Sequence, residues 1–251
     1  MSSLMEKGFR QWKEQCLNKL DLSKKGQVDE DIAHVVTLLN SCEQYFTTSS
    51  CSGRIILTDG AQKHGCVWLF VSHQQCKSED LVSAVARSSG DAVLKFEPFV
   101  LHVQCRRLED AQLTHSVAIN SGFRNSGLTV SKTGKIITAV RSTHGLEVPL
   151  SHQGKLLVEQ EYICFLTHIA NKKMEENLRR IHRFYQNLQS ALDTDKLPAE
   201  PQTHHHSQET KNQTSVYKRR RKREQQPGTD CCHGEGSSIE PELNDCLDLF
   251  T

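Results

Sequence analysis

The spacing of hydrophobic residues along positions 9–192 changes repeatedly between a helical period and a strand period. Apolar residues three and four positions apart, behind serine or acidic residues, predict helices at 28–40, 78–90, 108–122 and 159–192. The apolar stripe of the last helix consists of Met174, Leu178, Ile181, Tyr185, Leu188 and Leu192. Such a stripe is typical of an amphipathic helix that packs one side against a core.

Short apolar or alternating runs between turn residues predict the strands. They are expected at residues 54–57, 66–73 and 92–105, on both sides of the turn Thr133–Gly134, and at 146–152. In the longest run the apolar alternation shifts by one residue between Phe96 and Phe99, so we expect a β-bulge at Pro98. The opposite face of this strand carries Lys95, Glu97, His102 and Gln104. These polar side chains either face solvent or hold a polar ligand.

The order of these elements predicts an α+β fold with a mixed or antiparallel sheet, packed helices and a long C-terminal helix. A helix, a Ser/Thr/Asn-Gly segment and a strand follow one another in both halves of the chain, which points to a pseudo-twofold internal repeat. Such a repeat would bring the two polar segments together. No GxGxxG motif follows a first strand, so we exclude a Rossmann nucleotide-binding fold.

The composition divides the chain into two parts. Residues 1–192 are expected to form the folded domain, whereas residues 193–251 are rich in proline, glutamine, histidine, serine and charges and predict a disordered polar tail. The formal net charge is only +1, so affinity for nucleic acid has to come from local patches. The run KRRRKR at Lys218–Arg223 is such a patch, suited to nuclear import or to contact with RNA phosphates; the alternative is a solvated run with no role.

Ten cysteines raise the question of compartment and of metal binding. The first residues have no apolar signal-peptide core, and the apolar runs are shorter than the ~20 residues of a membrane span. We therefore expect a cytoplasmic protein with reduced thiols, also nuclear if Lys218–Arg223 directs import. His64, Cys66, His73 and Cys76 have ligand-like spacing. A buried strand separates the two pairs and no CxxC motif is present, so no metal site is predicted.

The stretch YFTTSSCSGR at 45–54 crowds hydroxyls, a thiol, a glycine and an arginine together before an apolar strand. It matches no cysteine-phosphatase, P-loop or nucleophile-elbow motif. What remains is a set of small hydrogen-bond donors beside Gly53, which would suit a carboxylate, a phosphate or a ribose. The alternative is a polar turn whose hydroxyls bond to their own backbone.

Two later segments have a similar character. GFRNSG at 122–127 places an arginine between two glycines, either as a ligand site or as a helix C-cap followed by a turn. VRSTHGLEV at 140–148 adds a second arginine and a histidine that has either a structural or a chemical role.

Four motifs in this order, TTSSCSGRI, LKFEPFVLHVQCR, GFRNSG and VRSTHGLEVPL, resemble the tRNA wybutosine-synthesizing protein 3 family over about residues 9–192. The resemblance implies a methyltransferase that uses S-adenosylmethionine and has an α+β fold distinct from the Rossmann methyltransferases. Its substrate would be ring nitrogen N4 of a 7-(aminocarboxypropyl)-demethylwyosine-type base beside the anticodon of tRNA(Phe), one step of wybutosine biosynthesis. We also expect loose association with other enzymes of that pathway, and no membrane.

Methyl transfer from a sulfonium depends on positioning, and a base is needed only if the acceptor nitrogen loses a proton. The hypothetical catalytic residues are Glu97, His102 and His144. The donor would contact Thr48, Ser49, Ser50, Ser52, Gly53 and Arg54. The tRNA base and its phosphates would contact Arg124, Asn125, Ser126, Arg141, Ser142 and Thr143. We expect the two glycine-flanked clusters to share one pocket.

Two other functions fit parts of the pattern. A noncatalytic tRNA-binding module would use the polar segments and the basic run while another protein performs the chemistry. A small-molecule hydrolase would need a nucleophile and base pair, which the sequence does not offer.

Overall fold

The computed structural model describes residues 3–19, 26–60 and 66–195, with side chains for those between Lys7 and Thr194. The chain divides into two units, Met1–Glu200 and Pro201–Thr251. Residues 193–195 of the predicted tail are helical. Residues 196–251, with the basic run, lie outside the described residues, and their predicted disorder stays a prediction. Among the helices that are described, none is both long and apolar enough to cross a membrane.

The helices of the first unit are α1 (Ser3–Leu17), α2 (Glu30–Ser41), α3 (Ser78–Val85), α4 (Leu108–Asn120) and α5 (Gln160–Asp195). The strands of the main sheet are β1 (Tyr45–Asp59), β2 (Val67–Ser72), β3 (Ala92–Cys105), β4 (Gly127–Val130), β5 (Ile136–Val140) and β6 (Leu146–Pro149). A small second sheet pairs β7 (Ser151–His152) with β8 (Lys155–Leu156). The predicted α+β fold with a long C-terminal helix is confirmed.

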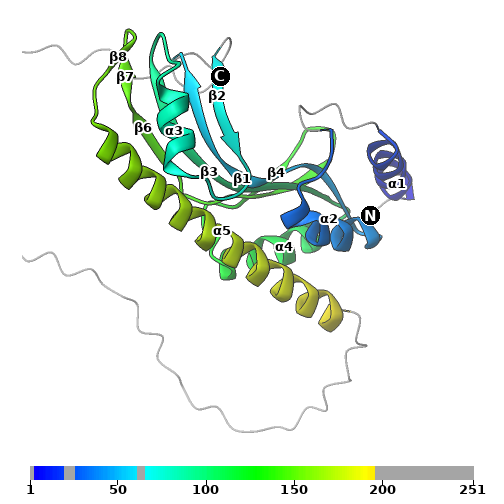
Figure 1. Ribbon diagram of the computed structural model, residues 1–251. Coiled ribbons are helices and arrows are strands. Elements are labelled where there is room, and N and C mark those ends of the chain that lie inside the picture. Colours follow the sequence, from blue (N-terminus) through cyan, green and yellow to red (C-terminus); the bar gives the residue numbers. More distant parts are fainter. Residues whose placement is uncertain (1–2, 20–25, 61–65, 196–251) are drawn as a thin grey trace, which may run out of the picture. The chain divides into compact units, whose positions relative to one another are not determined.

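The main sheet has the strand order β2-β1-β3-β5-β4, and β6 pairs with the other end of β3. Every described strand pair is antiparallel. The long strands β1 and β3 form its centre, and α5 runs along the pair (Figure 1). A helix followed by a hairpin occurs twice, as α2–β1–β2 and α4–β4–β5. Strand β1, the first of its hairpin, and strand β5, the second of its hairpin, both lie next to β3. The two helix–hairpin segments therefore pair with β3 in different ways.

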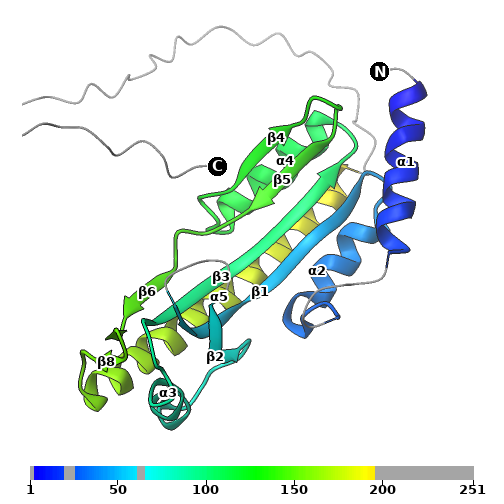
Figure 2. The ribbon, with the colours of Figure 1, turned by 90° about the horizontal axis from the view of Figure 1, so that it is seen from above.

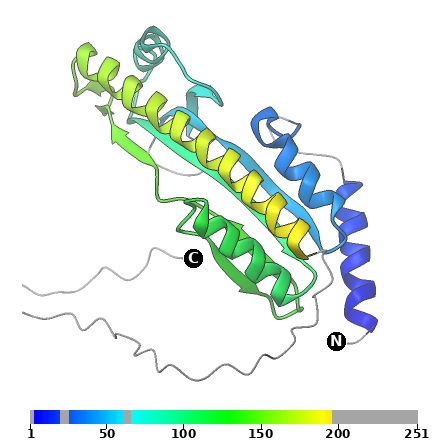
Figure 3. The same ribbon diagram turned by 90° about the horizontal axis from the view of Figure 1, so that it is seen from below.

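The two faces of the sheet differ in what covers them. Helices α4 and α5 lie in front of the strands in Figure 3. Two hydrophobic clusters pack the four helices α2, α3, α4 and α5 against this face. One cluster packs α2, α4 and the end of α5 against β1, β3 and β5, and the other packs α3 and the start of α5. Figure 2 looks onto the other face, where α1 lies beside one end of the strands. We call this second face the open face.

The hydroxyl-rich stretch does not form a loop before a strand that begins at Arg54, as the sequence predicted. It belongs to β1, which pairs with β3 from Tyr45 to Asp59. The polar residues lacked the apolar alternation by which strands are recognised, but the apolar neighbour β3 supplies the pairing. Because side chains alternate along a strand, the residues of this stretch are divided between the two faces of the sheet.

The predicted bulge at Pro98 is wrong, although the change of apolar face from Phe96 to Phe99 is confirmed by their burial. The register of β1 against β3 does not shift at this point, although Ser52 and Phe99 are not paired with each other, and the shift in register lies between Thr47 and Ser49. Pro98 is paired with Gly53, whose φ is +109°. Both strands therefore change their facing together.

Asn177 of α5 completes the backbone hydrogen bonds at this change of facing. Its side chain donates to the carbonyl of Ser52 at 2.6 Å and accepts from the amide of Phe99 at 2.8 Å. The residue is 1% exposed. A Cβ on Gly53 would come within 2.8 Å of the Asn177 Nδ2 atom. Both the positive φ and the close approach of this amide require glycine at position 53.

The buried stripe of α5 differs in part from the predicted one. Asn177 and Phe184 are buried, whereas Leu178 is 36% exposed and Tyr185 only partly buried. A polar residue at a core position shifted the stripe by one residue. The helix continues three residues beyond its predicted end, to Asp195.

Candidate polar site on the open face of the sheet

The register of β1 and β3 places several predicted site residues on the open face. Ser49 is opposite His102, and Arg54 is opposite Glu97. Residues directly opposite each other in an antiparallel pair point to the same side of the sheet. Their neighbours Ile55 and Phe96, also a pair, belong to the core under the helices. The polar side chains therefore project from the open face, on the side of the sheet opposite α2, α3, α4 and α5.

His102 connects three strands by hydrogen bonds. Its Nδ1 atom lies 2.7 Å from the Ser49 hydroxyl, and its Nε2 atom lies 2.8 Å from the guanidinium of Arg141, just after β5. A guanidinium can only donate, so Nε2 accepts and the ring proton is on Nδ1. Nδ1 then donates to the Ser49 oxygen, which leaves the hydroxyl proton of Ser49 to be donated elsewhere.

The surroundings of His102 favour the neutral form of its imidazole ring. Burial lowers the pKa of His102, and the Arg141 cation lowers it further. At neutral pH the ring is therefore uncharged, consistent with its acceptance of a hydrogen bond from Arg141.

Arg54 and Glu97 form an ion pair on the same face. The Arg54 Nε atom lies 2.7 Å from a Glu97 carboxylate oxygen, and the guanidinium carbon lies 4.8 Å from the centre of the Trp68 ring. The Glu97 side chain is 45% exposed, so a ligand can reach its carboxylate. Lys95 of β3 and Glu147 of β6, which are opposite each other, form a second ion pair at 2.8 Å.

The two predicted clusters meet at Arg141. Its amide donates to the Ser126 hydroxyl, and its carbonyl accepts from the amide of Asn125. Hydrogen bonds thus run from Ser49 through His102 and Arg141 to the glycine-flanked segment. The side chain of Arg124 is exposed beside them. The structure therefore joins the two segments that the sequence expected to meet, although they are more than seventy residues apart.

Other members of the predicted donor set lie elsewhere. Thr48 is exposed and donates to the carbonyl of His102 at 3.3 Å. Ser50 is half-buried and is opposite the core residue Leu101. Ser52 and Gly53 are buried on the side of Asn177 and serve the packing of α5.

Ser142 and His144 lie with the helices rather than with His102. The Ser142 hydroxyl accepts from Arg180 of α5 at 3.2 Å, and the His144 ring packs against Phe96. Burial lowers the pKa of His144, and the Arg180 and Lys173 cations add to this effect. Thr143 between them is exposed. The three hypothetical catalytic residues are therefore divided, with Glu97 and His102 on the open face and His144 apart.

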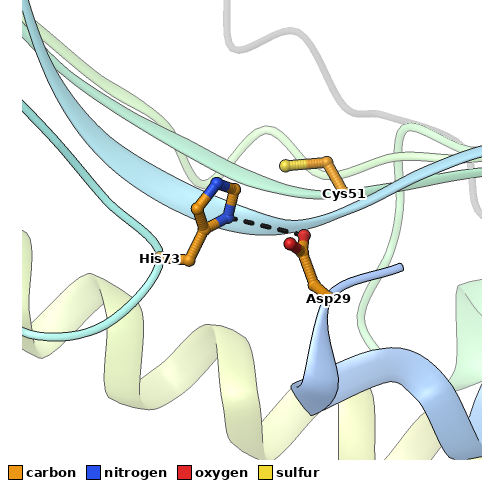
Figure 4. A group of neighbouring side chains, drawn as sticks. All are labelled: Asp29, Cys51 and His73. Atoms are coloured by element: carbon orange, nitrogen blue, oxygen red, sulfur yellow. Dashed lines mark ion pairs between the residues drawn. The ribbon is translucent and has the colours of Figure 1, made fainter. Parts of the chain in front are cut away.

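The structure also gathers residues that the sequence analysis left out of the site. Asp29 before α2 and His73 after β2 lie next to Cys51 of β1, as Figure 4 shows. The three ligand-type atoms are all within 4.8 Å of one another. Burial raises the pKa of the Cys51 thiol, and the Asp29 charge adds to the effect. Spacing along the chain paired His73 with Cys76 as possible metal ligands, but Cys76 is not part of this cluster.

A cavity of about 440 Å³ lies at α1, lined by Phe9, Arg10, Lys13, Glu43 and Arg106. None of the predicted site residues lines it. The convergence of polar side chains, rather than this cavity, defines the candidate site, because the predicted site residues meet there.

Comparison with known proteins identifies the family. A family model described as methyltransferase TYW3 matches residues 11–190, most of the chain. The chain belongs to the methyltransferase TYW3 family. Within this family, the "tRNA wybutosine-synthesizing protein 3 homolog" of Danio rerio is 61% identical over 223 residues, which are 86% of each chain.

An archaeal relative carries a more specific name. The "tRNA(Phe) 7-((3-amino-3-carboxypropyl)-4-demethylwyosine(37)-N(4))-methyltransferase 2" of Pyrococcus abyssi is 36% identical over 171 residues, 66% of this chain and 82% of its own. Among solved structures, the PH1069 protein from Pyrococcus horikoshii superposes with a TM-score of 0.68 at 31% identity. The match covers 73% of this chain and 97% of the archaeal one. The family expected from the four motifs is thus confirmed.

Proposed function

We propose that this TYW3-family chain transfers a methyl group from S-adenosylmethionine to ring nitrogen N4 of a 7-(aminocarboxypropyl)-demethylwyosine-type base in tRNA(Phe). The substrate follows the name of the Pyrococcus abyssi relative. The observation that carries the proposal is the hydrogen-bonded chain Ser49–His102–Arg141, which joins both predicted clusters on the open face of the strands that also carry the Arg54–Glu97 pair.

The donor fits the chemistry of the first cluster. When bound, S-adenosylmethionine supplies an electrophilic methyl group, and its amino-acid and ribose portions need donors and acceptors of hydrogen bonds. The free hydroxyl proton of Ser49 and the guanidinium of Arg54 are suited to a carboxylate or a ribose oxygen. Ser52 and Gly53 act indirectly, because they fix the strand from which Ser49 and Arg54 project.

To bind the acceptor base within its tRNA, the protein needs cationic groups for the phosphates and a flat surface on which the base can stack. Arg124 is exposed and Arg141 lies at the end of the hydrogen-bonded chain, so both can contact RNA phosphates or base edges. Trp68 on the neighbouring strand offers an aromatic surface, already approached by Arg54, on which a flat base can stack. In this arrangement the base lies over the centre of the sheet.

Proton removal from the acceptor, if the reaction requires it, falls to Glu97. Its carboxylate is accessible and lies beside the proposed donor contacts. The lone pair of His102 Nε2 is occupied by Arg141, so His102 acts as a positioning residue for Ser49. His144 packs against Phe96 under the sheet and is the least suitable of the three hypothetical bases.

A reconstituted reaction tests the proposal. Purified full-length protein, S-adenosylmethionine and tRNA(Phe) that carries the unmethylated tricyclic base should yield a base heavier by one methylene, detected by mass spectrometry of nucleosides. Binding of this tRNA with no heat of binding for S-adenosylmethionine and no change of mass would contradict it. That result would instead support the noncatalytic tRNA-binding module, which membership in a methyltransferase family disfavours.

A further inference from the structure

Three side chains with different metal-binding atoms converge where α2, β1 and β2 meet. Figure 4 shows the Asp29 carboxylate, the Cys51 thiol and the His73 imidazole gathered from three separate elements. Their ligand atoms lie within 4.8 Å of one another. We propose that Asp29, Cys51 and His73 bind one divalent transition-metal ion, with zinc the best match to their donor atoms.

The geometry is close to that of a bound ion. Zinc binds sulfur at about 2.3 Å and nitrogen or oxygen at about 2.0–2.2 Å, so tetrahedral ligands lie about 3.3–3.6 Å apart. His73 Nδ1 is already 3.4 Å from Asp29 Oδ2. The remaining separations, at most 4.8 Å, close by about an ångström through side-chain rotation.

The donor set selects the class of metal. A thiolate and an imidazole favour zinc and its neighbours over magnesium or calcium, which prefer oxygen ligands. Three protein ligands with a fourth position left for water or a substrate atom are typical of zinc sites that take part in chemistry. Arg54, the neighbouring cation, is paired with Glu97, which reduces its repulsion of a metal ion.

Asp29 is turned toward this site and away from its own helix. It is the N-cap residue of α2, yet its side chain makes no capping hydrogen bond. Instead its Oδ2 atom accepts from the amide of Ser52 at 2.7 Å. A carboxylate oxygen has a second lone pair, so this bond holds the group in place while leaving capacity for a metal. The residue is 6% exposed, so its carboxylate is largely shielded from bulk solvent.

His73 supplies a second observation. Its Nδ1 atom is buried and has no hydrogen-bond partner among the described residues. The 3.4 Å separation from Asp29 is long for a hydrogen bond to a carboxylate. A buried ring nitrogen without a partner is costly in free energy, and a bound metal ion would supply the missing partner of the His73 Nδ1 atom.

Cobalt titration of the chelator-treated, reduced full chain tests the site. Cys231, Cys232 and His204–His206 lie outside the described residues and also offer metal ligands. The titration therefore uses the Cys231→Ser/Cys232→Ser background, and only thiolate-to-cobalt absorption is counted. We expect one equivalent of Co²⁺ with this absorption, displaced by Zn²⁺ with loss of the band.

Two variants and one control make the outcome specific. Cys51→Ser should abolish the charge-transfer band, and His73→Gln, at a half-exposed position, should abolish or strongly weaken it. Cys164→Ser changes a comparably half-buried free cysteine on α5 and should leave the band unchanged. Circular dichroism establishes that each variant is folded.

The proposal fails if the folded background protein shows no thiolate-to-cobalt band, or if Cys51→Ser keeps it. Neither result bears on methyl transfer to tRNA, because the metal site is inferred from ligand geometry alone.

Discussion

The two faces of the central strand pair, β1 and β3, carry different kinds of side chain, apolar on one and polar on the other. The face under the helices buries an apolar core, in which Leu94, Phe96, Phe99 and Leu101 are at most 1% exposed. Neighbouring residues of the same strands point to the open face, where they form ion pairs and a hydrogen-bonded histidine. A single pair of strands therefore supplies an apolar core on one side and, in the proposed function, the reacting groups on the other.

The difference teaches how a non-Rossmann methyltransferase can be built. Buried apolar area on the helix side stabilises the sheet, so polar residues on the open side are not needed for folding. Substitutions on the helix side should then reduce stability, and substitutions on the open side should reduce activity with stability nearly unchanged.

The largest expected effect lies under the sheet, at Asn177. Asn177→Leu leaves the Ser52 carbonyl and the Phe99 amide buried without partners, so the free energy of unfolding should fall by about 2–5 kcal/mol. Asn171 is the matched control, since it bonds both backbone groups of Cys76 but is only partly buried. Asn171→Leu should lower the free energy by about 1 kcal/mol in the same urea titration. Equal losses would contradict the assigned role of burial.

Gly53 should follow in magnitude. Gly53→Ala places a side chain at φ +109° and 2.8 Å from the Asn177 amide, which should lower the free energy of unfolding by about 2–4 kcal/mol. At Gly127 the same change meets no atom within 4 Å and no positive φ. Gly127→Ala should change stability by less than about 1 kcal/mol, also measured by urea unfolding. A stable Gly53→Ala protein would show that the strand can change its facing without glycine.

On the open face, Arg141 should separate activity from stability. Arg141→Gln removes the partner of His102 Nε2 and a proposed RNA contact, so kcat/KM for tRNA methylation should fall about tenfold or more. The free energy of unfolding should change by less than about 1 kcal/mol. The control Arg179→Gln, on the exposed side of α5, should leave the rate within about twofold. A large loss of stability in Arg141→Gln would erase the contrast between the faces.

The smallest effect is a change of protonation at His102. Its pKa in the folded protein is below the ordinary 6.5, so the unfolded chain binds the proton more readily. The contribution to stability is therefore present above the unfolded pKa and is lost as the pH falls through the folded value. Arg141→Gln removes the second cause and should raise the pKa toward 6.5, as followed by NMR of the imidazole. An unchanged pKa would mean that Arg141 does not contact the ring in solution.

The sequence predicted the helix-covered side well, because periodicity is a local property. The range 92–105 of β3 matches its predicted bounds, and α4 begins at its predicted first residue. Helix α1 was not predicted, and the buried stripe of α5 differs in part from the predicted one. The prediction also failed for the polar half of β1, where strand structure depends on pairing with β3 rather than on local alternation. Asn177 was not recognised either, since its partners lie 125 and 78 residues away.

The meeting of the two polar segments was predicted from the sequence, whereas the role of their residues as a site stays a prediction. Ser49, Arg54 and Arg141 were selected by their unusual residue types, and the structure joins their segments. The division of neighbouring serines between two faces was not foreseen, because it needs the register of the strand. Asp29 offered only the signal of an acidic residue before a helix, and His73 that of a histidine after a strand. Their proximity to Cys51 arises from the tertiary fold.

Ser49 and Ser50 allow the most direct test of the open face as the donor site, because adjacent serines point to opposite sides of the sheet. Calorimetry with S-adenosylhomocysteine compares Ser49→Ala with Ser50→Ala. Our account predicts about three- to tenfold weaker binding for Ser49→Ala, as expected from one lost hydrogen bond, and a change below about twofold for Ser50→Ala. Weaker binding for Ser50→Ala with Ser49→Ala unchanged would place the donor on the helix side and contradict the account.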